Sequence, residues 1–274
     1  MSELTLAQWQ LQARQQGVDR LDAQLMLCEV LGQNRTWLLA HDQDQLSTAQ
    51  HTQLQEWLKR RAQGEPLAYI LGRKEFFGLT LAVNPHVLVP RPDTEVLVEW
   101  ALELIPPDAP WRVLDLGTGS GAIALALQHQ RPQAQVTAVD ASEGALQTAQ
   151  ANARQLGLPV RFLHGSWLEP VQGECFDLIV SNPPYIAEGD PHLPALTHEP
   201  ISALTAGQDG LDDIRAIVQN AYRHLRPGAW LLLEHGYDQA EVTSTLLKQA
   251  GYAAVQSRQD LGGHQRCTGG QTRI

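Results

Sequence analysis

Cysteine is scarce in this sequence, and its histidines show no metal-binding pattern. The three cysteines, Cys28, Cys175 and Cys267, are far apart and form no Cys-x-x-Cys pair. This odd, scattered set argues against a disulfide framework or a zinc knuckle and is typical of a protein from a reducing compartment. None of the ten histidines belongs to a His-Glu-x-x-His motif, so we expect no metal site.

Long apolar runs are also missing. No stretch approaches the roughly 20 apolar residues that a membrane-spanning helix requires. Residues 1–9 contain neither the basic segment nor the apolar segment that begins a secretory signal. We therefore expect a cytoplasmic protein that does not enter a membrane.

Positive charge is in short supply. The chain has 20 Lys and Arg against 30 Asp and Glu, a net charge of −10. Residues 1–75 hold 8 basic and 9 acidic residues, and the rest of the chain holds 12 and 21. A domain that binds duplex nucleic acid usually carries a basic patch that neutralises phosphates. We therefore expect no direct contact with nucleic acid.

The first 75 residues carry helix signals but no chemical motif. One predicted helix is capped by Asp19 and ended by Gly32, and a second begins with a capping box at Ser47. Their apolar faces are expected to be Leu21, Leu25, Cys28 and Leu31 in the first helix, and Leu54, Trp57, Leu58 and Arg61 in the second. The pattern predicts an N-terminal helical domain over residues 1–75.

The next segment changes character. Residues 76–83 alternate loosely between apolar and polar and are followed by Asn84-Pro85, which predicts a β-hairpin linker over residues 76–90. Pro, Arg and acidic residues then crowd together before a helix that Asp93 or Thr94 would cap. A linker requires neither Arg91 nor Glu95, so both residues are candidates for a functional role.

Residues 91–274 form the third predicted region, in which strands and helices alternate. The strand candidates are 111–116, 135–140, 159–164, 175–181, 229–235, 252–257 and 264–270. Helices are expected at 121–130, 142–156, 210–225 and 238–250. This alternation indicates an α/β fold with a doubly wound sheet. The long polar loop 186–209 is typical of a lid or a binding loop.

A glycine-rich turn follows the first of these strands. Gly117, Gly119 and Gly121 let the backbone approach a ligand, and the helix that follows offers free N–H groups. The turn, which includes Thr118 and Ser120, also satisfies a dinucleotide-binding fingerprint through Gly117, Gly119 and Ala122. Asp115 favours S-adenosyl-L-methionine over a nicotinamide cofactor, because its carboxylate suits an ammonium group and not a pyrophosphate.

Two further residues are candidates for the same ligand. Asp140 ends the second strand, where its carboxylate could accept both ribose hydroxyls or could cap the helix that begins near Ser142. Trp167 follows the third strand and offers an apolar face to an adenine ring, although it could also be a core residue.

The most informative stretch is Asn182-Pro183-Pro184-Tyr185, directly after a buried strand. Two consecutive prolines fix the backbone, so the Asn182 side chain and the carbonyls of Asn182 and Pro183 are held rigidly at the strand's carboxyl end. Ligands bind at that edge of an open α/β sheet. The stretch predicts a set of acceptors for a planar –NH₂ group, with Tyr185 stacked on its face.

These residues resemble one family, the glutamine N5-methyltransferases of peptide chain release factors, often called PrmC or HemK. The resemblance rests on residues 64–72, Pro90-Arg91-Pro92-Asp93-Thr94-Glu95, the glycine turn, Asn182 to Tyr185 and residues 233–236. It implies a seven-stranded, Rossmann-like class I methyltransferase domain behind a small helical domain. The implied reaction transfers a methyl group from S-adenosyl-L-methionine to the glutamine of the Gly-Gly-Gln motif in class I release factors, leaving S-adenosyl-L-homocysteine. We expect the enzyme to be a monomer.

The resemblance also implies residue roles. The cofactor residues would be Asp115, Gly117, Thr118, Gly119, Ser120, Gly121, Asp140, Ser166, Trp167 and Asn182. The substrate residues would be Arg91, Glu95, Asn182, Pro183, Pro184 and Tyr185. Asn182, Pro183 and Tyr185 would be catalytic, with Asn182 and the Pro183 carbonyl accepting the two amide hydrogens of the glutamine.

The chain departs from the family pattern in two places. Ser166 replaces the usual Asp, so a neutral hydroxyl would receive the adenine amino group. The C-terminus, 267–274, is atypical and contains Gly269-Gly270-Gln271, which we interpret as coincidence. The alternatives to the family function are an N6-adenine or other nucleic-acid amino methyltransferase, a nicotinamide oxidoreductase and a cofactor-free binding module.

Overall fold

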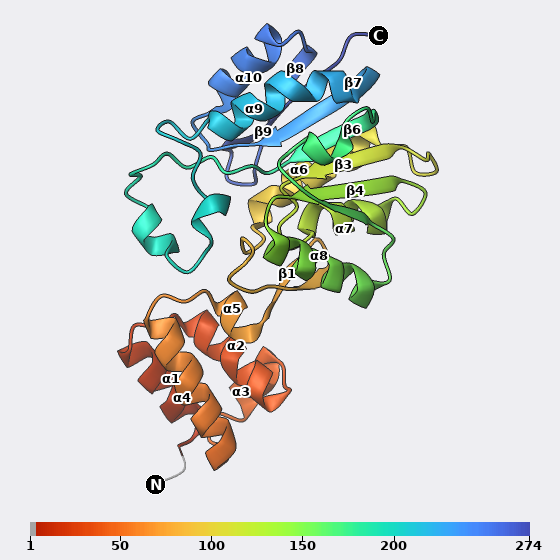
Figure 1. Cartoon of the computed structure of the whole chain (residues 1–274). Helices are drawn as coiled ribbons and strands as arrows, with labels where there is room; N and C mark the ends of the chain where they lie inside the picture. Colours follow the sequence, from red (N-terminus) through yellow and green to blue (C-terminus); the bar gives the residue numbers. More distant parts are fainter. Residues whose placement is uncertain (1–3) are drawn as a thin grey trace. The chain divides into compact units, whose positions relative to one another are not determined.

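The computed structural model describes residues 4–274, which form two compact units, 4–72 and 73–274. The smaller unit is helical (Figure 1). Its helices are α1 (Leu6–Gln15), α2 (Arg20–Leu31), α3 (Arg35–Ala40), α4 (Thr48–Ala62) and α5 (Leu67–Leu71). The capping box at Ser47 is confirmed, since the Ser47 hydroxyl accepts from Gln50 N–H and the Gln50 side chain accepts from Ser47 N–H.

Helix α2 has the predicted ends, but its predicted apolar face is only partly correct, because Cys28 and Leu31 pack against the core and Leu21 does not. Asp19 caps α2, and Gly32 ends it in the left-handed conformation. The residues that α2 buries include Ala23, Met26 and Leu27, whereas Leu21 is 45% exposed. Helix α2 carries apolar residues on several of its sides. Periodicity alone therefore could not select the face that packs against Trp9, Leu54 and Leu58.

The larger unit begins with a hairpin that lies earlier than predicted. Strands β1 (Arg73–Phe76) and β2 (Leu79–Ala82) pair in antiparallel fashion. Phe77 and Gly78 connect them with positive φ values of 49° and 79°, as in the tight turns that suit a β-hairpin. The sequence of β1 is polar and shows no apolar alternation, so the sequence pattern does not reveal this strand.

A seven-stranded sheet forms the centre of the larger unit. In spatial order its strands are β5 (Arg161–His164), β4 (Gln135–Asp140), β3 (Arg112–Leu116), β6 (Phe176–Ser181), β7 (Leu225–Glu234), β9 (Gln265–Gln271) and β8 (Ala253–Gln259). Neighbouring strands from β5 to β7 are parallel, and β9 is antiparallel to both of its neighbours. The predicted α/β fold is therefore confirmed.

Helices cover both faces of this sheet (Figure 1). They are α6 (Glu95–Leu104), α7 (Ala122–Gln130), α8 (Glu143–Leu156), α9 (Asp212–Ala221) and α10 (Ala240–Gln249). Successive strand residues point to opposite faces. Val113 and Leu178 accordingly join the core beneath α6 and α7, while Leu114 and Ile179 join the core beneath α9.

The strand order reverses between β3 and β6. From β3 the chain proceeds to β4 and β5 on one side, and it then returns to β6 and β7 on the other. Ligands of open α/β sheets bind at such a point, outside the carboxyl ends of the strands. The glycine turn, Asp140 and Asn182 all lie at the carboxyl ends of these strands.

The C-terminal Gly-Gly-Gln triplet lies inside the sheet. Gly269, Gly270 and Gln271 belong to β9, which hydrogen-bonds to β7 on one side and β8 on the other. A Cβ atom on Gly269 would lie 2.5 Å from the Leu232 side chain and 2.8 Å from that of Trp100. Packing therefore requires glycine at this position.

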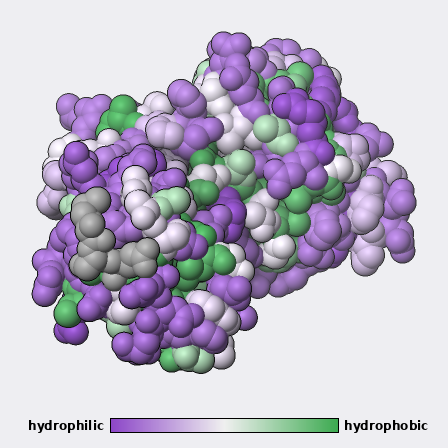
Figure 2. Space-filling view, turned by 90° about the horizontal axis from the view of Figure 1, so that it is seen from below, coloured by the Kyte–Doolittle hydropathy of each residue, from purple (hydrophilic) through white to green (hydrophobic). Residues whose placement is uncertain are grey.

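The surface is largely hydrophilic on the face that Figure 2 shows. In the smaller unit, large hydrophobic side chains at the surface are Leu11, Leu21 and Leu39, which are 56%, 45% and 68% exposed. No helix within residues 4–274 is long and apolar enough to cross a membrane.

Candidate active site

A cavity of about 450 Å³ lies at the carboxyl ends of β3, β4 and β6. Its size is within the range of small-molecule sites, roughly 300–1,000 Å³. The lining residues come from segments 86–94, 117–123, 140–145, 166–167, 182–184 and 200–203, together with Asp213. Of the predicted cofactor residues, the walls contain Gly117, Thr118, Gly119, Ser120, Asp140, Ser166, Trp167 and Asn182.

The glycine turn is shaped by main-chain hydrogen bonds. The N–H groups of Gly117 and Thr118 both donate to the Val139 carbonyl, at 2.9 and 3.0 Å. Gly117 and Gly119 have φ values of 71° and 57°, which a side chain would strain. Gly121 serves packing and does not line the cavity, because a Cβ there would lie 2.9 Å from the Leu125 side chain.

Asp115 lies behind the cavity wall. It is fully buried, and one carboxylate oxygen accepts a 2.6 Å hydrogen bond from the Thr118 hydroxyl. The other, Oδ1, has no partner among the described residues. Burial raises the pKa of the carboxyl to about 7. An unpartnered carboxylate oxygen beneath the glycine turn fits a site for a positively charged group.

Asp140 lines the cavity and does not cap α8. Ser142 is the cap, since its hydroxyl accepts from Ala145 N–H at 3.2 Å. The two Asp140 oxygens accept from Gly119 N–H and Ser142 N–H, each at 2.8 Å. Burial raises the pKa of Asp140, and these two hydrogen bonds oppose the shift. The carboxylate is therefore held in one orientation at the cavity wall.

Trp167 closes the cavity beside the glycine turn. Its backbone has an unusual φ of 45°, and its ring would lie 3.3 Å from a Cβ on Gly117. Asp213, which the sequence reasoning missed, lines the same cavity. Burial raises the pKa of Asp213, and a hydrogen bond with Trp167 opposes the shift. Asp213 lies in the first turn of α9, where acidic residues are common, so its sequence position carries no sign of a ligand site.

A second cavity, of about 340 Å³, adjoins the first. Pro183, Tyr185 and Ile186 contribute to its lining. Four residues line both cavities, and these are Leu88, Arg91, Asn182 and Ala203. Asn182 therefore stands where a cofactor-sized cavity meets a smaller one. Pro184 lines only the larger cavity.

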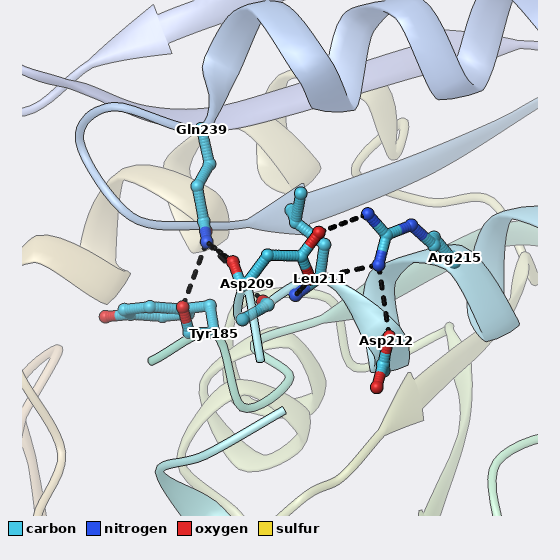
Figure 3. Close-up of polar contacts among 7 residues, drawn as sticks. Tyr185, Asp209, Leu211, Asp212, Arg215 and Gln239 are labelled. Carbon is cyan, nitrogen blue, oxygen red and sulfur yellow. Dashed lines mark hydrogen bonds and ion pairs between the residues drawn. The ribbon is translucent and has the colours of Figure 1, made fainter. Parts of the chain in front are cut away.

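The loop that follows Tyr185 is held at both ends (Figure 3). The Gln239 amide donates to the Tyr185 carbonyl at 3.0 Å and to the Gly210 carbonyl at 3.4 Å. Arg215 pairs with Asp209 at 2.5 Å. A Cβ on Gly210 would lie only 2.3 Å from the Tyr185 carbonyl oxygen, so the two ends meet closely because this residue is glycine.

The middle of the loop is fastened to the segment before α6. The Glu199 carboxylate, with 2% of its side chain exposed, pairs with the Arg91 guanidinium and accepts from Val89 N–H at 3.0 Å. Arg91 therefore lines both cavities while its guanidinium is paired with the Glu199 carboxylate. Glu95 lies in neither wall, and its carboxylate accepts from Phe77 N–H at 3.1 Å in the hairpin turn.

Comparison with known proteins follows the same division of the chain. Residues 4–72 match the model of the PrmC N-terminal domain, and residues 94–203 match that of the methyltransferase small domain. The release factor glutamine methyltransferase of Coxiella burnetii is 49% identical over 248 residues, covering 90% of each chain. That of Bordetella pertussis is 50% identical over 258 residues, covering 93% of this chain and 95% of the relative.

A solved structure supports the fold. The crystal structure of a methyltransferase from Pyrococcus furiosus matches with a TM-score of 0.57 and 20% identity, covering 83% of this chain and all of that one. At this identity the likeness concerns the fold alone.

Proposed function

The chain belongs to the release factor glutamine methyltransferase family, and from this premise we propose that it methylates the side-chain amide nitrogen of a release factor glutamine. The target we propose is the glutamine of a Gly-Gly-Gln motif in class I release factors. The observation that carries the proposal is the position of Asn182, which lines both the cofactor-sized cavity and the smaller cavity beside it.

The larger cavity fits S-adenosyl-L-methionine, whose sulfonium supplies an electrophilic methyl group. Asp140 would accept hydrogen bonds from the ribose hydroxyls, and Trp167 and Ser166 would contact adenine. The glycine turn, with the unpartnered Asp115 oxygen beneath it, would receive the methionine portion. The product of the cofactor is S-adenosyl-L-homocysteine.

The smaller cavity would hold the target glutamine. An amide nitrogen is a weak nucleophile, because its lone pair is delocalised into the carbonyl. Asn182 Oδ1 and the Pro183 carbonyl would accept the two amide hydrogens and orient the nitrogen toward the methyl carbon. Positioning of this kind supplies about 7–11 kcal/mol in favourable cases. Attack of the amide nitrogen on the methyl group gives a cationic, N-methylated amide, which is acidic enough to lose one proton to water, so no protein base is needed.

We assign the smaller unit to substrate docking. Residues 4–72 hold no chemical motif, and they expose Leu11, Leu21 and Leu39. The near-balanced charge of residues 1–75 suits a protein partner better than a phosphate backbone. We propose that the enzyme acts as a monomer on a folded protein and does not bind nucleic acid directly.

The test is transfer of a labelled methyl group. Release factor, DNA and tRNA would each be incubated with the enzyme and methyl-labelled cofactor, followed by mass spectrometry of the products. We expect one methyl group on the Gly-Gly-Gln glutamine. Label in DNA or tRNA, with none in the release factor, would support the nucleic-acid amino methyltransferase alternative.

A further inference from the structure

Segment 84–91, between the hairpin and α6, lines both cavities of the candidate active site. The larger cavity is lined by residues 86–88, 90 and 91 of this segment, and the smaller one by Leu88 and Arg91. Val87 and Val89 are 1% and 5% exposed, so the segment is packed into its unit. The position of segment 84–91 therefore affects the shape of both cavities at once.

The beginning of this segment is attached to α8. The Asn84 side-chain amide donates to the Thr148 hydroxyl at 2.9 Å. Just before the segment, the buried Asn152 side chain accepts from Ala82 N–H at 2.7 Å and donates to the Ala82 carbonyl at 3.0 Å. The Asn152 amide also donates to the Ser120 carbonyl of the glycine turn at 2.9 Å. This end is therefore fixed by buried side chains of α8.

The other end of the segment is attached to the long loop after β6 through Glu199. One carboxylate oxygen of Glu199 accepts from Val89 N–H at 3.0 Å, and the other pairs with the Arg91 guanidinium. The Glu199 side chain is 2% exposed. Pro200 and Ala203, which follow Glu199 in the loop, line the larger cavity. Glu199 therefore joins two segments that form walls of the same cavity.

The charge of Glu199 suits this connection. A carboxylate has two acceptor oxygens, and here each receives a different donor from segment 84–91. An amide in its place would turn an NH₂ group toward one of these donors. A buried N–H that loses its acceptor is costly, so the loop and the segment would separate more readily. Glu199 itself lies in neither cavity wall.

We propose that Glu199 is a positioning residue, which holds segment 84–91 and the loop in the arrangement that forms both cavities. The inference rests on the proposed function, because it takes the smaller cavity as the site of the target glutamine. A ligand that binds only one arrangement loses affinity in proportion to the fraction of molecules that have it. Glu199 therefore raises the affinity for cofactor and for substrate together, without contacting either.

Loss of Glu199 should make the two ligands cooperative. While the two segments are held together, one ligand has little effect on the affinity for the other. When they separate, the first ligand must assemble both cavities, and the second then binds to cavities that are already formed. This coupling is reciprocal. Cooperative binding should therefore appear in the variant and be absent from the wild type.

Glu199→Gln tests the proposal, since glutamine keeps the size of the side chain and removes its charge. Isothermal titration would measure the Kd for S-adenosyl-L-homocysteine with and without a saturating Gly-Gly-Gln peptide. In the variant we expect Kd to rise about 10-fold without peptide and to return to within about twofold of the wild-type value with it. An unchanged Kd would overturn the proposal, and so would a loss of affinity that the peptide does not restore.

The matched control is Glu174→Gln. Glu174 also pairs with arginine, through Arg112 and Arg161, but it lies in neither cavity wall. This variant should bind S-adenosyl-L-homocysteine as the wild type does, with and without peptide. Urea unfolding of both variants would verify that any loss of affinity concerns the cavities and not the whole fold.

A further measurement requires no substitution and no substrate. In the wild type without ligands, Val89 N–H should exchange with solvent at least about 10-fold more slowly than in an unstructured peptide. Fast exchange would overturn the proposal even if release factors were methylated. Slow exchange of Val89 N–H, in an enzyme that binds cofactor but leaves release factors unmodified, would support the positioning role of Glu199 and refute the proposed function.

Discussion

Replacing Asp140 by Asn should weaken cofactor binding through the ribose contact. Asparagine keeps the size of the side chain and one acceptor oxygen, but it removes the charge. A hydrogen bond to a charged group contributes about 1.5–3 kcal/mol, which corresponds to a roughly 10- to 100-fold increase in Kd. Isothermal titration with S-adenosyl-L-homocysteine would measure the change.

Asp140 also has a structural role, for which the binding test needs a control. Asp140 also accepts from Gly119 N–H and Ser142 N–H, so an asparagine side chain here would leave one of these donors facing an NH₂ group. That local damage should cost about 1–3 kcal/mol of stability in the ligand-free protein, measurable by urea unfolding. Asp177→Asn is the matched control, because Asp177 accepts from Arg112 N–H at 2.8 Å near the opposite end of β6. It should leave Kd unchanged.

A ligand lacking one hydroxyl separates the ribose contact from the local damage. The 2′-deoxy analogue of S-adenosyl-L-homocysteine should bind the wild type more weakly, and Asp140→Asn should then cost less than it does with the natural ligand. An equal loss of affinity for both ligands would refute a ribose contact, and an unchanged Kd for Asp140→Asn would remove Asp140 from the cofactor site.

The remaining predictions concern catalysis, docking and stability. Asn182→Ala should abolish detectable methyl transfer while the cofactor Kd changes by less than about tenfold; an active variant would refute the proposed role of Asn182. A truncated protein of residues 73–274, which has its own core, should bind cofactor and methylate a Gly-Gly-Gln peptide as the full chain does, but lose most activity on intact release factor. Equal rates on intact release factor would refute docking. Burial raises the pKa of Asp115 from its ordinary value of 3.8 to about 7 in the folded protein. Between these two pH values the folded state holds a proton that the unfolded state has released, so stability should fall as pH rises through this range. Asp115→Asn should reduce that fall by up to about 1.4 kcal/mol per pH unit in urea unfolding, and an unchanged slope would contradict the buried, protonated state.

The sequence was most informative where local chemistry decides structure. The run Val136 to Asp140 and the run Phe176 to Ser181 are apolar strands bounded by turn residues, and both were located almost to the residue. Asn182 and Gly117 could be assigned to a ligand site because each directly follows such a strand. The order of parallel strands then brings them to one edge.

Other features depended on contacts that local patterns do not encode. Helix α2 is apolar on several sides, so only its packing shows that Met26 is buried and Leu21 is not. Glu199 lies in a polar loop, and its sequence context gave no sign that its carboxylate would be buried. Its partner, Arg91, is 108 residues away, and the pair becomes visible only in the folded chain.

The location of Gly269-Gly270-Gln271 in β9 has a consequence for selectivity. The enzyme contains the same triplet that we propose as its target, so recognition of three residues alone would make every molecule a competitor of the release factor. In the folded enzyme the main chain of this triplet is already paired with β7 and β8, and the chain cannot extend into another molecule's cavity. Folding therefore protects one copy of the enzyme from methylation by another, and only an unfolded copy would present the triplet as a substrate.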